Sequence, residues 1–391
     1  MLPASEFVNI ARECGLDFYT GVPCSFLTPL INRVISDRSL QYVGATSEGE
    51  AIGIAAGAWL AGRLPVVMCQ NSGLGNTVNP ITSLNHTLRI PLLLVTTWRG
   101  QPGLYDEPQH EVMGPITPSL LETIRVPHQI FAGEPDGLSD QLETAVSYMD
   151  RKRLPYALLM QKDTIAPEPL SSAPRETRPR ARVQDLRTMT GRPSRFDVLS
   201  AVIATIPATA AVVATTGKCA RELFTVGDRP QNLYAVGSMG CASAIGLGLS
   251  LHVERPVVVL DGDGAALMKM GNMATIGAHA PKHLVHIILD NGVHDSTGGQ
   301  ETVSATIDFA MIAAACGYAS AARCDDLIGF GKALDSVLQQ TGAHLIHVQI
   351  TPGSIEKLGR PTVAPDVVAA RFRDFVTTRA SSLRVTAESA V

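Results

Sequence analysis

The sequence places an aspartate between two glycines directly after an apolar run. Gly262-Asp263-Gly264 follows residues 257–260, which read Val-Val-Val-Leu. Glycines let backbone N–H groups approach phosphate oxygens closely, and a following helix would add its positive N-terminal end. We therefore expect Gly262, Gly264 and Ala265 to contact a diphosphate. A hard divalent cation would neutralise that diphosphate, and the carboxylate of Asp263 is a suitable ligand for it.

A second oxygen-rich turn, Asp290-Asn291-Gly292, follows the next apolar run, 284–289. The spacing from Asp263 to Asn291 suits one βαβ unit. Neighbouring parallel strands would bring both turns to the same carboxyl edge of a sheet. The Asp263 carboxylate, the Asn291 amide oxygen and a nearby main-chain carbonyl would then form half of an octahedral magnesium shell.

Two other interpretations compete with the metal site. Each turn taken alone is an ordinary surface turn. A nicotinamide site would need a Gly-x-Gly-x-x-Gly loop, and Gly73-Leu-Gly75 in the first half lacks the third glycine. The order of the two turns, each after a buried strand, favours the metal site.

The predicted strands are continuous apolar runs rather than alternating ones. This pattern is typical of parallel strands buried on both faces, and the helical segments between the runs predict an α/β fold. The runs are 65–69, 90–96, 156–160, 211–214, 256–260, 284–289 and 345–350.

The two halves of the chain resemble each other. In each half a helix of small residues leads to a buried strand and then a glycine-rich turn, at 51–76 and again at 244–264. This repetition predicts two related, doubly wound parallel-sheet domains with a cofactor cleft between them.

Residues 167–195 break the strand–helix rhythm. The segment is rich in proline and carries seven arginines between Arg175 and Arg195. We expect a solvated linker rather than a nucleic-acid-binding arm. The predicted organisation is a first domain at 1–166, a second at 196–380 and a polar tail at 381–391.

Composition excludes several classes of protein. Of 391 residues, 45% are hydrophobic and 17% charged, and the net charge of −4 provides no basic field for nucleic acid. The seven cysteines are scattered without zinc-ligand spacing. We find no apolar run long enough to span a membrane and no signal-peptide pattern, so we expect a cytoplasmic protein.

Gly262-Asp263-Gly264 followed by Asp290-Asn291 resembles the signature of the thiamine-diphosphate enzymes. The resemblance implies that Asp263, Asn291 and the main-chain carbonyl of Val293 bind Mg²⁺. The usual signature ends in Asn-Asn. Here Asp290 replaces the first asparagine, and the metal-binding second position is intact.

The resemblance also implies an activating glutamate on the other domain, nine residues before a glycine. Glu48 and Gly57 match this pattern. In the family this carboxylate promotes the tautomer of the cofactor that removes the thiazolium proton. The alternative is a helix cap: Ser47 and Glu50 form a capping-box pattern, and Glu48 would favour the helix dipole in any protein.

Two further segments match cofactor-binding positions of the family. By position, the carbonyl of Gly237 accepts a hydrogen bond from the cofactor's amino group, and Met239 supports its bent shape. An ordinary core role is the alternative for Met239. Thr216 and Gly217 follow a predicted strand and could contact the diphosphate.

The short linker resembles the arrangement of phosphonopyruvate and sulfopyruvate decarboxylases, which lack the central domain of most relatives. The resemblance implies non-oxidative decarboxylation of a 2-oxo acid, with the cofactor as electron sink. We favour phosphonopyruvate, giving phosphonoacetaldehyde and CO₂. Ser25, Arg99 and His294 are candidate substrate ligands, and Lys218 and Arg221 are further candidate partners of the phosphonate, although any of these cations could instead pair with surface acids. His110 is a candidate acid–base residue or an isolated surface histidine.

The family normally pairs the diphosphate half of one subunit with the pyrimidine half of another. We therefore expect a homodimer or a larger even assembly with inter-subunit active sites. The rival functions are sulfopyruvate decarboxylation, carboligation to a ketol, and noncatalytic binding of a nucleotide or diphosphate by a regulator.

Overall fold

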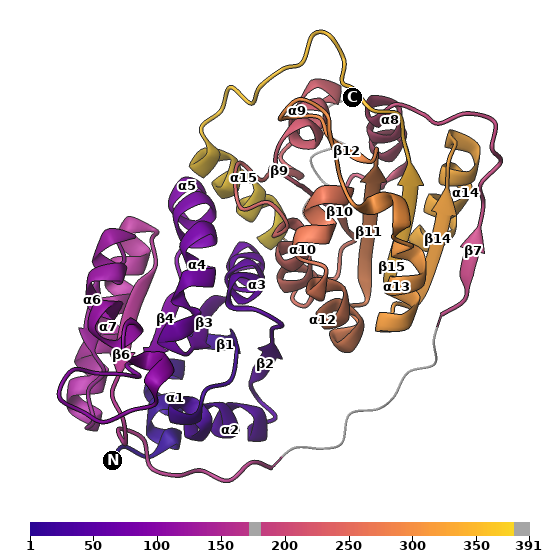
Figure 1. The fold of residues 1–391 in the computed structure, drawn as a ribbon. Helices are drawn as coiled ribbons and strands as arrows, with labels where there is room; N and C mark the ends of the chain where they lie inside the picture. The colour runs from indigo at the N-terminus through magenta and orange to yellow at the C-terminus, as the bar shows by residue number, and fades with distance from the viewer. Residues whose placement is uncertain (172–180, 379–391) are drawn as a thin grey trace. The chain divides into compact units, whose positions relative to one another are not determined.

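The computed structural model describes residues 1–171 and 181–378. The chain divides into two compact units, Met1–Trp59 with Arg63–Thr177 and Leu60–Gly62 with Arg178–Val391 (Figure 1). Part of the predicted linker, 172–180, and the predicted tail, 381–391, lie outside the described residues. None of the described helices is long and apolar enough to cross a membrane.

The first unit is built on a six-stranded parallel sheet with the order β2-β1-β3-β4-β6-β5. Its strands are β1 (Leu16–Gly21), β2 (Gln41–Gly44), β3 (Leu64–Cys69), β4 (Leu93–Thr97), β5 (His128–Ile130) and β6 (Tyr156–Met160). Its helices are α1 (Ala4–Glu13), α2 (Thr28–Ser36), α3 (Glu48–Leu60), α4 (Leu74–Pro80), α5 (His86–Leu88), α6 (Met113–Thr123) and α7 (Pro135–Lys152).

Both faces of this sheet are buried. Because successive strand residues point to opposite sides, a single strand contributes to the core on both faces. Val66 and Met68 of β3 pack in a cluster with residues of α1, α2 and α7. Val67 and Cys69 of the same strand pack in a second cluster with residues of α3, α4 and α6. This double burial explains why the strand is a continuous apolar run.

The second unit contains a seven-stranded parallel sheet with the order β7-β14-β15-β11-β10-β8-β9. Its strands are β7 (Val183–Asp185), β8 (Ala211–Ala214), β9 (Asn232–Tyr234), β10 (Val257–Gly262), β11 (His283–Asp290), β14 (Ser320–Cys324) and β15 (Gly342–Gln349). A separate antiparallel pair is formed by β12 (Val293–His294) and β13 (Gln300–Glu301).

The helices of the second unit fall into two packed groups. Helix α8 contacts α9 and α14, and α12 contacts α10 and α13. The full set is α8 (Arg195–Thr205), α9 (Lys218–Val226), α10 (Ala242–Ser250), α11 (Asp263–Met268), α12 (Gly271–His279), α13 (Phe309–Cys316), α14 (Leu327–Leu338) and α15 (Pro365–Thr377).

Strand β7 corrects part of the linker prediction. Residues 183–185 were expected in a solvated connector, but they pair with β14 at the edge of the second sheet. Arg195, counted in the same segment, is the first residue of α8 and is buried. The proline and arginine content of the segment concealed a short edge strand and a helix start.

The two sheets share one strand order. In the first, β1 lies between β2 and β3, and in the second β8 lies between β9 and β10. In both sheets the strand order therefore reverses between two neighbouring strands, β1 and β3 in the first sheet and β8 and β10 in the second. We call each of these the central pair of its sheet. Ligands of such folds bind at the carboxyl ends of this central pair. The predicted α/β fold with two related doubly wound sheets is confirmed.

Candidate active site

The two oxygen-rich turns lie at one edge of the second sheet, as predicted. Strands β10 and β11 are neighbours, and Gly262 is in register with Leu289. Thr302 connects the turns, because its hydroxyl donates a hydrogen bond to Asp263 and its N–H donates to the carbonyl of Gly292 at 2.8 Å. Asp263 therefore lies beside the turn that carries Asn291.

The environment of the Asp263 carboxyl group is suited to binding a cation. It is only 3% exposed, and burial raises its pKa although the Thr302 hydrogen bond opposes the shift. Within residues 1–171 and 181–378 no Lys, Arg or His forms an ion pair with it, so this buried carboxylate has no counter-charge from the protein. A buried anion without such a partner is costly, and a bound divalent cation would supply the charge.

The candidate metal ligands are not a cluster of acids and histidines. Among the described residues, no three His, Cys, Asp or Glu side chains are grouped to hold an ion. A set built from one carboxylate, one amide oxygen and a main-chain carbonyl matches that finding. These oxygen donors, with the adjoining glycine turn, fit Mg²⁺ and a diphosphate.

Asp295 fixes the orientation of the Asn291 amide. The Nδ2 atom of Asn291 donates to the Asp295 carboxylate at 2.6 Å, and the Oδ1 atom accepts from the N–H of Val293 at 3.2 Å. Because a carboxylate only accepts, the nitrogen must face Asp295 and the oxygen must face the other way. The arrangement presents Oδ1, the atom that a metal requires.

Asp295 is itself held by a buried ion pair. Arg195, only 7% exposed, donates to the carboxylates of both Asp295 and Glu222, and the Glu222 contact measures 3.1 Å. The N–H of Gly353 also donates to Asp295, at 3.0 Å. Sequence reasoning missed these residues because their partners lie far apart in the chain. Arg195 was not singled out because it is one of seven arginines in the segment that we predicted to be a linker.

Asp290, the departure from the usual Asn-Asn pair, has its own partners. His347 Nε2 lies 2.9 Å from one carboxylate oxygen, and Ser304 and the N–H of Gly292 donate to the other at 2.8 and 3.1 Å. Burial raises the pKa of Asp290, but the hydrogen bonds from His347 and Ser304 outweigh it, so the pKa lies below its usual value. His347 thus provides a partner for the carboxylate that stands at position 290 in place of the usual asparagine amide.

Gly264, Met239 and His294, three of the predicted site residues, lie together. A Cβ atom at Gly264 would be 2.6 Å from Cε1 of His294 and 3.2 Å from Cε of Met239. By contrast, Gly262 faces open space, and Ala265 is buried at the start of α11. A larger residue at position 264 would have to displace the ends of these two side chains.

The loop that carries Gly237 and Met239 has an unusual backbone. Ser238, between them, has a φ of +53°, in the left-handed region that non-glycine residues rarely adopt. Such strain is found most often where a backbone is held for a ligand. The loop precedes α10, the counterpart of α3 in the first unit.

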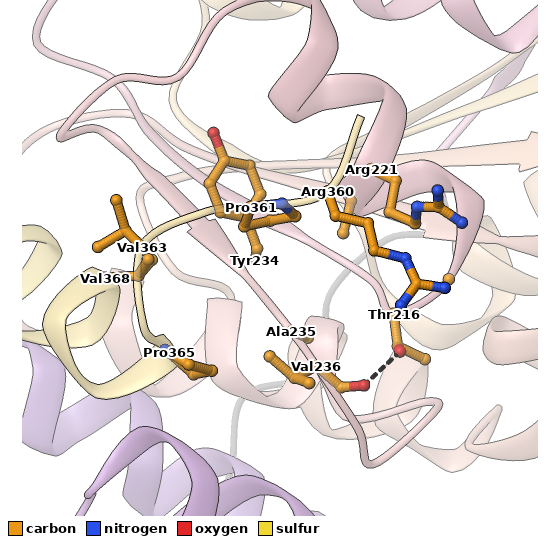
Figure 2. Close-up of a pocket in the computed structure, with 12 residues that line it drawn as sticks. Thr216, Arg221, Tyr234, Ala235, Val236, Arg360, Pro361, Val363, Pro365 and Val368 are labelled. Carbon is orange, nitrogen blue, oxygen red and sulfur yellow. Dashed lines mark hydrogen bonds between the residues drawn. The ribbon is translucent and has the colours of Figure 1, made fainter. Parts of the chain in front are cut away.

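Thr216 and Gly217 follow β8, at the central pair of the second sheet. The Thr216 hydroxyl donates to the carbonyl of Val236 at 2.8 Å, and Gly217 has a φ of +90°. Both residues line a pocket of about 350 Å³ (Figure 2). They are therefore accessible to a ligand at this edge.

Glu48 begins α3 and lies beside a glycine turn. Its carboxylate accepts a hydrogen bond from Asn76 Nδ2 at 2.8 Å. A Cβ atom at Gly73 would lie 2.2 Å from the Glu48 Oε1 atom, so glycine leaves the space that the carboxylate fills. The side chain is half-buried rather than enclosed in the core.

Glu50, and not Glu48, stabilises the helix start, as the capping interpretation predicted. The N–H of Glu50 donates to the Ser47 hydroxyl at 3.2 Å. The Glu50 carboxylate reaches back to the N–H and hydroxyl of Thr46 rather than to the N–H of Ser47. Because Glu50 meets the capping requirement, Glu48 is left for another role.

Ser25 and Arg99 are brought together, but the charge of Arg99 is matched. Nη1 of Arg99 donates to the Ser25 hydroxyl at 3.0 Å, while Nε donates to Asp106 at 2.8 Å. Hydrogen bonds from Arg99 hold the pKa of Asp106 well below its usual range. His110 is 2% exposed and its Nδ1 has no hydrogen-bond partner among the described residues, so the surface-histidine alternative is wrong.

The comparisons with known proteins agree with this geometry. The thiamine pyrophosphate enzyme N-terminal TPP binding domain matches residues 4–117, and the C-terminal TPP binding domain matches residues 215–348. Solved structures share the fold: a 4-hydroxybenzoylformate decarboxylase of Rhodococcus jostii RHA1 has a TM-score of 0.70 at 14% identity, covering 91% of this chain and 100% of that one.

Curated relatives match nearly the whole chain. Phosphonopyruvate decarboxylases are 48% identical in Streptomyces hygroscopicus, over 96% of this chain and 94% of that protein, and 49% identical in Streptomyces viridochromogenes, over 97% and 96%. A sulfopyruvate decarboxylase of Methanosarcina acetivorans is 31% identical over 95% and 97%. The chain belongs to the thiamine pyrophosphate-dependent decarboxylases.

Proposed function

We propose that this enzyme converts 3-phosphonopyruvate to phosphonoacetaldehyde and CO₂. The observation that carries the proposal is the identity of 48% and 49% to two phosphonopyruvate decarboxylases over almost the full chain. The sulfopyruvate relative of similar coverage is 31% identical. Sulfopyruvate decarboxylation is therefore the second candidate.

When bound, thiamine diphosphate supplies the electron sink for cleavage of the carbon–carbon bond. In our proposal Asp263, Asn291 and the carbonyl of Val293 hold Mg²⁺, and Glu48 holds the proton that activates the cofactor ring. The remaining proposed cofactor contacts are Thr216, Gly217, Gly237, Met239, Gly262, Gly264 and Ala265. The counter-charge missing from buried Asp263 supports the metal assignment.

On the substrate side we propose Ser25, Arg99 and His294 as ligands and His110 as an acid–base group. The hydrogen bond between Arg99 and Ser25 supports a shared role for these two. Because Asp106 matches the charge of Arg99, this pair suits a carboxylate or carbonyl better than a dianion. The buried, unpartnered Nδ1 of His110 supports a polar role for that side chain.

The substrate test compares two acids with the purified protein, thiamine diphosphate and Mg²⁺. Phosphonopyruvate and sulfopyruvate are supplied separately, and CO₂ release and product identity are measured. We expect phosphonoacetaldehyde and a higher kcat/KM for the phosphonate. A preference for sulfopyruvate would replace the proposal, a ketol product would establish carboligation, and no turnover of either acid would favour a noncatalytic regulator.

We further propose an even homo-oligomer in which Glu48 of one subunit serves the Asp263 site of another. Sulfopyruvate decarboxylases with separate alpha and beta subunits support a division of the activity between chains. Co-expression of Glu48→Gln and Asp263→Ala chains tests it. Mixed assemblies should regain turnover, whereas sites contained within one chain would stay inactive. A cytoplasmic location remains a prediction.

A further inference from the structure

The pocket beside Thr216 and Gly217 has a feature that the proposed catalytic residues do not explain. Its walls come from three places in the second unit: the start of α9, the end of β9 with the two residues after it, and the segment that leads into α15 (Figure 2). Most of the lining is apolar, including Ala220, Val236 and Val363. Against this background the charged members stand out.

Two arginines, Arg221 and Arg360, line the pocket without a carboxylate partner. Within the described parts of the chain, neither forms an ion pair with an aspartate or glutamate, whereas Arg99 and Arg195 each do. Figure 2 shows the Arg360 side chain extending from its segment toward Thr216. The pocket therefore carries two positive charges that no described side chain neutralises.

The segment that carries Arg360 is fastened to α9. Arg221 donates from Nε to the carbonyl of Gly359 at 2.9 Å and from Nη2 to the carbonyl of Leu358 at 3.0 Å. The N–H of Gly359 in turn donates to the Thr225 hydroxyl at 3.0 Å. These three hydrogen bonds fix the backbone next to Arg360, which reduces the ordering that ligand binding would require.

We propose that Arg360, with Arg221 beside it, binds the phosphonate group of the substrate. This inference rests on the proposed function. A phosphonate carries up to two negative charges and three acceptor oxygens, which match two guanidinium groups better than the neutralised Arg99 pair. The apolar walls lower the local dielectric and strengthen the charge pairing. Thr216 and Gly217, which we assign to the cofactor, line the same pocket, so a substrate held by Arg360 would lie next to the cofactor.

The test separates binding from chemistry. We expect Arg360→Gln to raise the KM for phosphonopyruvate about 10- to 100-fold, the loss of charge-assisted hydrogen bonds, with kcat at saturation within about threefold. Competitive inhibition by methylphosphonate, which has the phosphonate but no ketone, should weaken by a similar factor. Arg360→Lys should recover part of both losses. Lys357→Gln, a neighbouring exposed cation outside the pocket lining, is the matched control and should change neither.

The outcomes distinguish this inference from the proposed function. If the wild-type enzyme does not turn over phosphonopyruvate, the proposed function itself fails. If the wild type is active and Arg360→Gln leaves KM within twofold, or lowers only kcat, the phosphonate site lies elsewhere. An equal effect of Lys357→Gln would reduce the role of Arg360 to general surface charge. Circular dichroism of each variant verifies that the fold is retained.

Discussion

The carboxyl edges of the two sheets have the same strand order but different chemistry. At the central pair of the first sheet the side chains that follow the strands are neutral, such as Cys24, Gln70 and Asn71. At the second, Asp263 and Asp290 are buried and ionisable. The fold thus determines where a ligand can bind, while the side chains at that edge determine which ligand binds.

The two edges also differ in how their key residues are supported. Glu48 is contacted by one turn of its own unit, through Asn76 and Gly73. Asn291 is oriented by a chain of contacts that runs through Asp295 to Arg195. The first arrangement leaves a carboxylate half-buried and held by few contacts. The second fixes the orientation of an amide, as the proposed metal ligand would need.

The largest expected effect is on Glu48. Glu48→Gln keeps the size and the Asn76 hydrogen bond but removes the acid, so we expect kcat to fall by about 10²- to 10⁴-fold. Affinity for Mg²⁺, measured by calorimetry in the presence of thiamine diphosphate, should change less than twofold because the metal residues belong to the other edge. Full turnover by the variant would remove Glu48 from the mechanism.

Asp263→Ala should, unlike Glu48→Gln, abolish the binding of Mg²⁺. It removes the only carboxylate of the proposed metal set, so saturable Mg²⁺ binding should be lost along with the metal-dependent part of cofactor affinity. The apo-protein should be no less stable, because a buried carboxylate without a counter-charge disappears. Calorimetry and thermal unfolding check the two expectations. Unchanged Mg²⁺ affinity would contradict the metal assignment.

Asp295 tests the supporting contacts. With Asp295→Ala the Asn291 amide can rotate, and we expect the Kd for Mg²⁺ to rise about 10- to 100-fold, as for other residues that orient metal ligands. The matched control is Asp308→Asn, which weakens another Arg–Asp pair of the second unit, with Arg323. Equal Mg²⁺ affinity in the two variants would mean that Asp295 only stabilises the fold.

Local patterns were enough to predict strands that are apolar along their whole length. The runs at 156–160 and 211–214 coincide with β6 and β8 because both are apolar throughout. Strand β1 was missed because Asp17 and Thr20 interrupt its apolar character. Strand β14, which reads Ser-Ala-Ala-Arg-Cys, was missed because its small residues give no strand signal and pairing with β15 decides its conformation.

The candidate site divides in the same way. Asp263, Asn291 and Glu48 stand in short motifs, so the sequence alone pointed to them. The contacts of Asp295 with Arg195 join positions 100 residues apart, and no single-sequence pattern reports such a pair. The pocket cation Arg360 was also missed, because its place at the pocket depends on tertiary contacts, among them the hydrogen bonds between its segment and α9.

The smallest expected effect concerns the space around Glu48. A Cβ atom at Gly73 would lie 2.2 Å from the Glu48 carboxylate, whereas one at Gly75 would meet no atom within 4 Å. Gly73→Ala should therefore displace the flexible end of Glu48 and lower kcat about tenfold, part of the loss expected when the acid is removed. Thermal stability should stay near that of the wild type, since a side-chain end can move without repacking the core. Gly75→Ala, the control, should retain full turnover. Equal activity of the two variants would show that the position of the Glu48 carboxylate tolerates movement, and the contrast between a loosely held acid and the rigidly held Asn291 amide would then be sharper still.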